Sequence, residues 1–132
     1  MNLESFVGKK TGTYSETLKP EDVKAFCEAV GIPFNQEKIP PTYLTTLRTG
    51  EFDLLKEIGV PLPQILHGEQ EYTYEKEIRP GSAIQFETEF TQVTKKEGKN
   101  GVMSFLIFTS KISSNGSLSA TSKTTVVARG VG

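Results

Sequence analysis

The sequence predicts a single α+β domain in which helices cover one face of an antiparallel sheet. Two observations lead to this prediction. Apolar residues in the first half recur at helical spacing, whereas those in the second half alternate with polar residues, as they do in strands. Turn signals such as Asn115-Gly116 separate the alternating segments, and such turns join antiparallel neighbours.

A short strand and a helix are expected first. Residues 9–18 (KKTGTYSETL) mix Thr, Tyr and Ser, which suits a strand. Pro20 fits the first position of a helix, and Gly31 ends it. Between these limits the apolar residues share one face of the helix: Val23, Phe26, Cys27 and Val30. Cys27 is therefore expected to be a small buried hydrophobe.

Two short helices are expected after a proline-rich loop at residues 32–41. Residues 41–48 (PTYLTTLR) start at a proline, place Tyr43 and two leucines on one side, and should end at Gly50. Residues 51–58 should turn three apolar side chains inward: Phe52, Leu55 and Ile58. We expect residues 41–48 to be the helix that packs against the sheet, because their apolar side has no other surface to cover.

Four strands are expected in the second half, joined in order as an antiparallel meander. They span residues 69–78, 83–93, 102–112 and 118–128. The third strand, VMSFLIFTSKI, is apolar on both faces, which predicts a central position in the sheet. Its Phe105 and Phe108 face opposite ways, so one belongs to the core and the other does not.

Composition excludes several classes of function. The chain has 132 residues, which is the size of one domain (1–132), and its 15 basic and 16 acidic residues argue against nucleic-acid or anionic-membrane binding. One cysteine and one histidine rule out an internal disulfide and the usual zinc clusters, so no metal site is expected. No signal peptide or membrane-spanning run is apparent, which predicts a cytoplasmic protein.

The only histidine, His67, is the first candidate for chemistry because its side chain titrates near neutral pH. If residues 66–80 pack on residues 40–47, Thr42 and Tyr43 lie close to it. Two interpretations of His67 stay open: an acid or base, or a hydrogen-bonded residue that holds its loop. Glu69 is two residues further on and would share its side of a strand, either as a partner or as an ordinary strand carboxylate.

Five segments occur in an order that resembles the MaoC-like hot-dog family: PPTY, LHGEQEY, IRPG, KNGVMSF and TTVVARG. The resemblance is to the N-terminal, FAS1-type dehydratase domain and to stand-alone subunits of (3R)-hydroxyacyl-thioester dehydratases. It implies an antiparallel sheet wrapped around a central helix, expected at residues 41–48. It also implies pairing with a second hot-dog subunit and an acyl thioester of coenzyme A or acyl carrier protein as substrate, without a further cofactor.

The family's reaction is the reversible hydration of an enoyl thioester, and its catalytic members use an Asp and a His from a D-x-N-P-x-H segment. The matching residues 30–40 (VGIPFNQEKIP) contain neither, and Glu37 is no clear replacement. The resemblance then implies the acyl-chain-binding half of a pair whose partner carries the Asp and the His. A homodimer that binds acyl thioesters without turnover is the alternative. A thioesterase is disfavoured because residues 41–48 hold no Asp or Glu.

The substrate-binding residues that this resemblance suggests are Thr42, Tyr43, His67, Gly68 and Phe105. Thr42 either caps the central helix or offers its hydroxyl and amide to the thioester carbonyl. Tyr43 lines an acyl tunnel or belongs to the core, and Phe105 lies in the tunnel or in the subunit interface.

Overall fold

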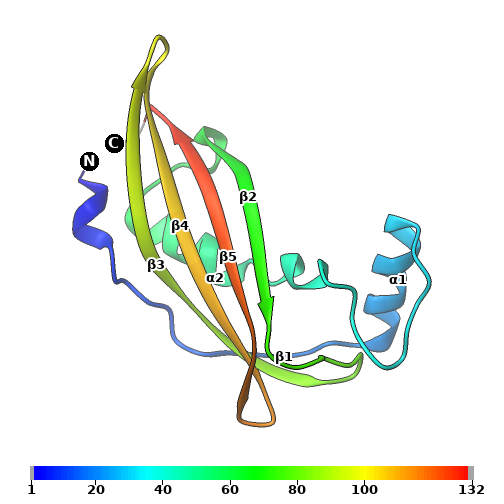
Figure 1. Ribbon diagram of the computed structural model, residues 1–132. Coiled ribbons are helices and arrows are strands. Elements are labelled where there is room, and N and C mark those ends of the chain that lie inside the picture. Colours follow the sequence, from blue (N-terminus) through cyan, green and yellow to red (C-terminus); the bar gives the residue numbers. More distant parts are fainter. Residues whose placement is uncertain (1, 131–132) are drawn as a thin grey trace.

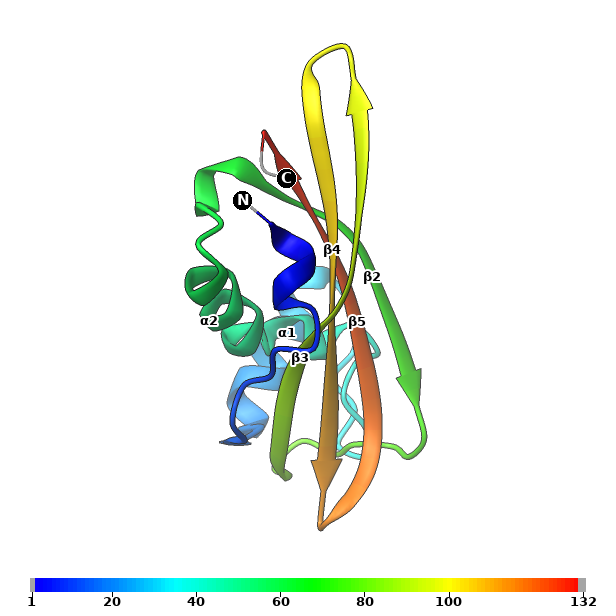
Figure 2. The same cartoon turned by 90° about the vertical axis from the view of Figure 1, so that its left-hand side faces the viewer.

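The computed structural model describes residues 2–130, which form a five-stranded antiparallel sheet with its helices on one face (Figures 1 and 2). The strands lie in the order β1-β3-β4-β5-β2. The elements are η1 (Leu3–Phe6), β1 (Tyr14–Thr17), α1 (Pro20–Val30), η2 (Tyr43–Thr46), α2 (Thr49–Ile58), η3 (Leu62–Gln64), β2 (Ile65–Tyr74), β3 (Ala83–Gly98), β4 (Gly101–Ser114) and β5 (Ser117–Arg129). This arrangement confirms the predicted α+β class.

The predicted meander is wrong for one strand. β3, β4 and β5 follow one another as hairpins, but β2 pairs with β5 at the far edge and not with β3. β4 lies in the middle of the sheet, as its apolar sequence predicted. The β3–β4 hairpin extends beyond the other strands (Figure 2), because β3 continues to Gly98 where a polar loop was expected.

The helix that crosses the sheet is α2, and the prediction of residues 41–48 is wrong. Those residues form only one short 3-10 turn, η2. α2 starts at Thr49 and continues through Gly50, which had been expected to end a helix. It buries Leu54, Leu55 and Ile58 against the sheet, whereas Phe52 stays 39% exposed beside the Arg48 guanidinium.

α1 matches its predicted limits. It begins at Pro20 and ends where Gly31 adopts a left-handed conformation, with φ of 77°. Val23 and Cys27 are buried, as the apolar stripe predicted, but Val30 in the last turn is 51% exposed.

The apolar core consists of two clusters separated by polar side chains. One cluster, around Phe86 and Ile112, lies towards α1, and the other, around Phe90 and Phe108, lies under α2. Along each long strand the inward residues between the clusters carry hydroxyl groups. We call this set, with two residues that reach it from α2 and β2, the polar belt: Glu51, Gln70, Thr88, Ser110, Ser122 and Thr124.

Candidate functional site at the polar belt

The first turn of α2 sits directly on the polar belt. A Cβ placed on Gly50 would lie 2.7 Å from the Cβ of Thr88 and closer still to its hydroxyl, so only glycine allows this approach. The Thr88 hydroxyl in turn lies 2.7 Å from that of Ser110 on β4. The close contact brings the amino end of α2, where backbone N–H groups lack helical partners, against the polar part of the sheet.

Glu51 is the charged member of the belt and is only 3% exposed. Its Oε1 accepts hydrogen bonds from Arg48 Nη2 at 3.1 Å and Nε at 3.4 Å. Its Oε2 accepts one from Thr124 Oγ1 at 3.0 Å. A carboxylate is stable at such depth only when it is paired and hydrogen-bonded, and here both oxygens have partners.

Thr124 and Gln70 connect this carboxylate to the edge of the sheet. Thr124 Oγ1 also lies 2.9 Å from Gln70 Oε1, but a hydroxyl has one hydrogen and donates to one acceptor at a time. His67 Nε2 lies 3.0 Å from the same Gln70 oxygen and supplies a hydrogen when Nε2 is protonated. The Gln70 amide nitrogen donates to Ser122 Oγ at 2.6 Å, which fixes the orientation of the amide. A continuous chain of polar contacts therefore runs from His67 to Arg48.

A β-bulge at Gly68 directs His67 into this chain. His67 lies opposite Val126 and Glu69 lies opposite Thr125, so one residue of β2 has no partner between them. The extra residue shifts the alternation, which turns His67 and Gln70 inward and Glu69 outward. Of the two expectations for Glu69, a partner of His67 or an ordinary strand carboxylate, the structure therefore favours the second. A side chain at Gly68 would come 3.1 Å from a methyl of Val127, so the bulge position is crowded as well.

Two tyrosines of β2 extend the polar contacts towards the loop before η2. The Tyr72 hydroxyl bonds to that of Thr45, and burial, followed by the charge of Glu51, raises the pKa of Tyr72. The Tyr74 hydroxyl donates to the carbonyl oxygen of Pro41 at 2.6 Å. Burial raises the pKa of Tyr74 to about 12, and both phenols stay protonated at neutral pH.

The predicted site residues do not come together. Tyr43 is buried in the cluster near α1, against the edge of Phe26, and its pKa is raised first by burial and then by Asp22. Thr42 is exposed and its side chain makes no capping hydrogen bond. Thr42 and Tyr43 lie near Tyr74 at one end of β2. Tyr74 is seven positions along the strand from His67, a separation of about 20 Å at the usual rise of a strand.

Phe105 lies on the opposite face of the sheet from the helices. Lys96 Nζ sits 5.6 Å from the centre of its ring, while Phe108 is fully buried against Phe90. The prediction that the two phenylalanines face opposite ways is confirmed. Phe105 shares no surface with the polar belt.

Sequence reasoning missed Glu51, Gln70 and Thr124. A signal for the belt was nevertheless present, because hydroxyl residues interrupt the inward apolar positions of three strands. Thr88 lies between Phe86 and Phe90, and Ser110 lies between Phe108 and Ile112. Glu51 itself gave no signal, because its role depends on which helix packs on the sheet.

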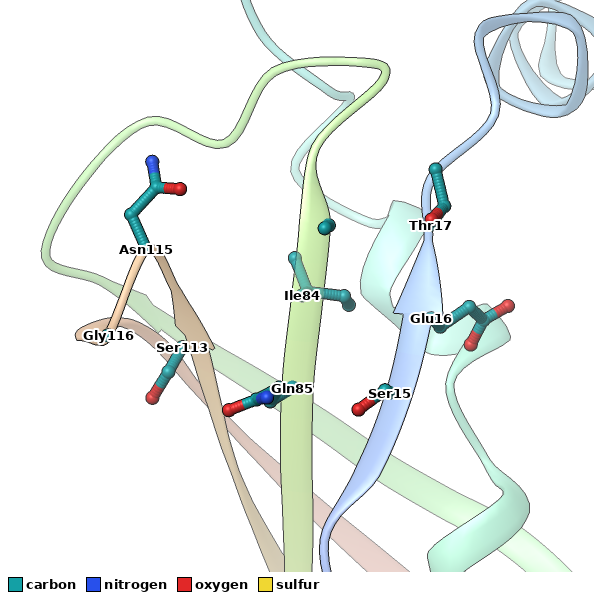
Figure 3. Close-up of a pocket in the computed structure, with 9 residues that line it drawn as sticks. Ser15, Glu16, Thr17, Ile84, Gln85, Ser113, Asn115 and Gly116 are labelled. Carbon is teal, nitrogen blue, oxygen red and sulfur yellow. The ribbon is translucent and has the colours of Figure 1, made fainter.

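Several hollows among residues 2–130 lie outside the belt. Residues 32–41 surround one of about 660 Å³, and residues 38–41 with 74–78 line another of about 310 Å³. A third, of about 450 Å³, lies where the ends of β1, β3 and β4 meet (Figure 3), and Ser15, Gln85 and Ser113 form a polar row across it. None of these three is lined by His67 or Glu51.

Two kinds of feature are absent from residues 2–130. No helix there is long and apolar enough to cross a membrane. No group of three or more His, Cys, Asp or Glu side chains in that range could hold a metal ion.

Comparison with known proteins identifies a matching family and solved structures with a similar fold. The family described as "FAS1-like, dehydratase domain region" matches residues 5–121. A search of curated proteins found no match.

Many solved structures match this chain, and three of them illustrate the shared fold. The HadBC (3R-hydroxyacyl-ACP dehydratase) complex from Mycobacterium tuberculosis has a chain that is 17% identical, with a TM-score of 0.79 over 93% of this chain and 97% of that one. The ChsH1-ChsH2 complex from the same organism is 12% identical, with a TM-score of 0.70 over 91% and 84%. The MaoC-like dehydratase from Rhodospirillum rubrum is 20% identical, with a TM-score of 0.59 over 97% and 96%.

Proposed function

The chain belongs to the FAS1-like dehydratase domain family and has the MaoC-like hot-dog fold, and from this premise we propose that it is one subunit of an enoyl-thioester hydratase or (3R)-hydroxyacyl-thioester dehydratase. In the hydration direction a hydroxyl adds to the β-carbon and a proton to the α-carbon of an enoyl thioester of coenzyme A or acyl carrier protein. This chain contributes the acyl-binding half, and a second hot-dog subunit supplies the acid and base.

The observation that carries this proposal is the placement of the acidic and basic groups that the reaction needs. Residues 32–41 contain neither an Asp nor a His. Of the two aspartates in the chain, Asp53 accepts a hydrogen bond from Tyr14, and Asp22 lies in the first turn of α1. His67 contacts the neutral amide of Gln70 and not a carboxylate, so its position supports no Asp-His pair within one chain.

A partner subunit is supported by the structural neighbours. HadBC and ChsH1-ChsH2 are complexes of two kinds of chain. This chain covers 97% of the matched chain of HadBC and 84% of the matched chain of ChsH1-ChsH2. We therefore propose a heterodimer in which the other hot-dog subunit bears the D-x-N-P-x-H segment.

The test is hydration of crotonyl-CoA and longer trans-2-enoyl-CoA esters. The reaction is measured as the loss of the enoyl absorbance. We expect the purified chain alone to turn over poorly and to gain activity only when a hot-dog subunit with an Asp and a His in that segment is added. Robust activity of the isolated chain that His67→Ala abolishes and Glu69→Ala leaves intact would overturn the proposed division of labour. Saturable acyl-CoA binding without activity, even with such partners, would instead favour a binding homodimer.

Thioester hydrolysis is a second candidate, and Glu51 favours it. Residues 41–48 hold no acid, but α2 is the helix on the sheet and carries Glu51 in its first turn. Release of free thiol from acyl-CoA, lost in Glu51→Gln, would support this candidate. Absence of thiol release across short and long acyl chains would eliminate it.

A further inference from the structure

Strand β2 forms an open edge of the sheet (Figure 1). β2 is ten residues long and pairs with β5 on one side only. Among residues 2–130, no backbone hydrogen bond joins β2 to any segment other than β5. The other edge strand, β1, has only four residues. A long unpaired edge presents N–H and C=O groups to a further strand, so β2 is the natural place for strand addition.

The outer face of this edge is acidic. Beyond the bulge Glu69, Glu71 and Thr73 point away from the helices, and all three are exposed. Lys123 on β5 lies opposite Glu71, but Glu69 has the neutral Thr125 as its neighbour. Glu75 is the next residue in this alternation and is also exposed.

This row of glutamates opposes pairing between two copies of the chain. In an antiparallel pair related by a twofold axis, residues directly opposite each other point to the same face. An axis at position 69 places Glu69 opposite its own copy, and an axis at 71 does the same for Glu71. An axis at 70 places these two opposite each other, and axes at 72 or 73 place Glu75 opposite Glu69 or Glu71. Each of these registers therefore sets like charges against each other, which destabilises the pair.

We propose that the open edge of β2 takes the edge strand of a different hot-dog subunit, one that carries Lys or Arg on the outer face of that strand. The glutamates then select the partner by attracting a basic edge and repelling a second copy of this chain. This inference rests on the proposed function, because it names the partner that the function requires. It also places that partner beside His67 and Gln70, where the polar belt meets the edge of the sheet.

The charge rule can be tested with the chain itself. The variant Glu69→Lys/Glu71→Lys serves as a hot-dog subunit with a basic edge, and sedimentation equilibrium measures the mass of each species. We expect the natural chain and the variant each to be monomeric, and an equimolar mixture to form a 1:1 dimer. Association in the mixture should be at least about tenfold tighter than self-association of either chain, and it should weaken as salt is raised.

The matched control is Glu28→Lys/Glu97→Lys, which changes the net charge equally at exposed positions on α1 and β3. Its mixture with the natural chain should stay monomeric. The proposal is overturned if this control associates as well as the edge variant, if the edge-variant mixture does not associate, or if the natural chain self-associates as tightly as the mixture. The measurement uses no acyl thioester, so its failure leaves the hydratase proposal standing, and failure of the hydratase assay leaves the charge rule standing.

Discussion

The contact between α2 and β3 makes Gly50→Ala the sharpest test of how the polar belt is built. The new methyl group would lie 2.7 Å from the Thr88 Cβ and even closer to its hydroxyl, so α2 must move away from the sheet. Overpacking of this kind costs about 1–3 kcal/mol. Alanine recovers at most about 1 kcal/mol of helix propensity, and less in a first turn. We therefore expect a net loss of about 1–2 kcal/mol of unfolding free energy.

Urea denaturation followed by circular dichroism measures this loss, and thermal unfolding should show a melting temperature about 3–8 °C lower. Gly98→Ala is the matched control, because nothing lies within 4 Å of its new methyl group. Thr88→Ala removes the nearest atom of the clash, so the double variant should lose less than the sum of the two single losses. A neutral Gly50→Ala, or strict additivity with Thr88→Ala, would show that α2 does not rest on Thr88 as described.

Three further predictions concern the belt and its tyrosines. Glu51→Ala should cost about 2–4 kcal/mol in urea denaturation, because it leaves a partly buried arginine without its partner; a loss under about 0.5 kcal/mol would contradict this. Two tyrosines have a pKa raised to about 12 in the folded state: Tyr14, by its hydrogen bond to Asp53, and Tyr74, by burial. Unfolding therefore releases protons above pH 10. Stability is then full below about pH 10 and declines towards pH 12, and an ultraviolet phenolate titration with all tyrosines ionising near pH 10 would refute this. Deleting Gly68 removes the bulge and leaves a regular ladder in which His67 stays opposite Val126, so NMR should still show a hydrogen-bonded Nε2; loss of that signature would contradict the register described for the bulge.

The candidate site could be predicted only in part. His67 was singled out from the sequence, but its contact with Gln70 depends on the bulge at Gly68, which a strict alternation does not anticipate. Thr42 and Tyr43 were expected beside it, but they lie near Tyr74, at the other end of β2 from His67. Glu51 was expected only as the first residue of a short helix, and among residues 2–130 it is one of the most deeply buried charged groups.

The sequence by itself determined the local elements. The limits of α1, the alternation of β3 to β5, the tight turn at Asn115-Gly116 and the central place of β4 all follow from periodicity and turn residues within short stretches. The tertiary structure alone decided which helix lies on the sheet and which strand forms its open edge. Both depend on contacts between residues far apart in the chain, such as Gly50 with Thr88 and β2 with β5, where packing against a distant surface overrides the local pattern.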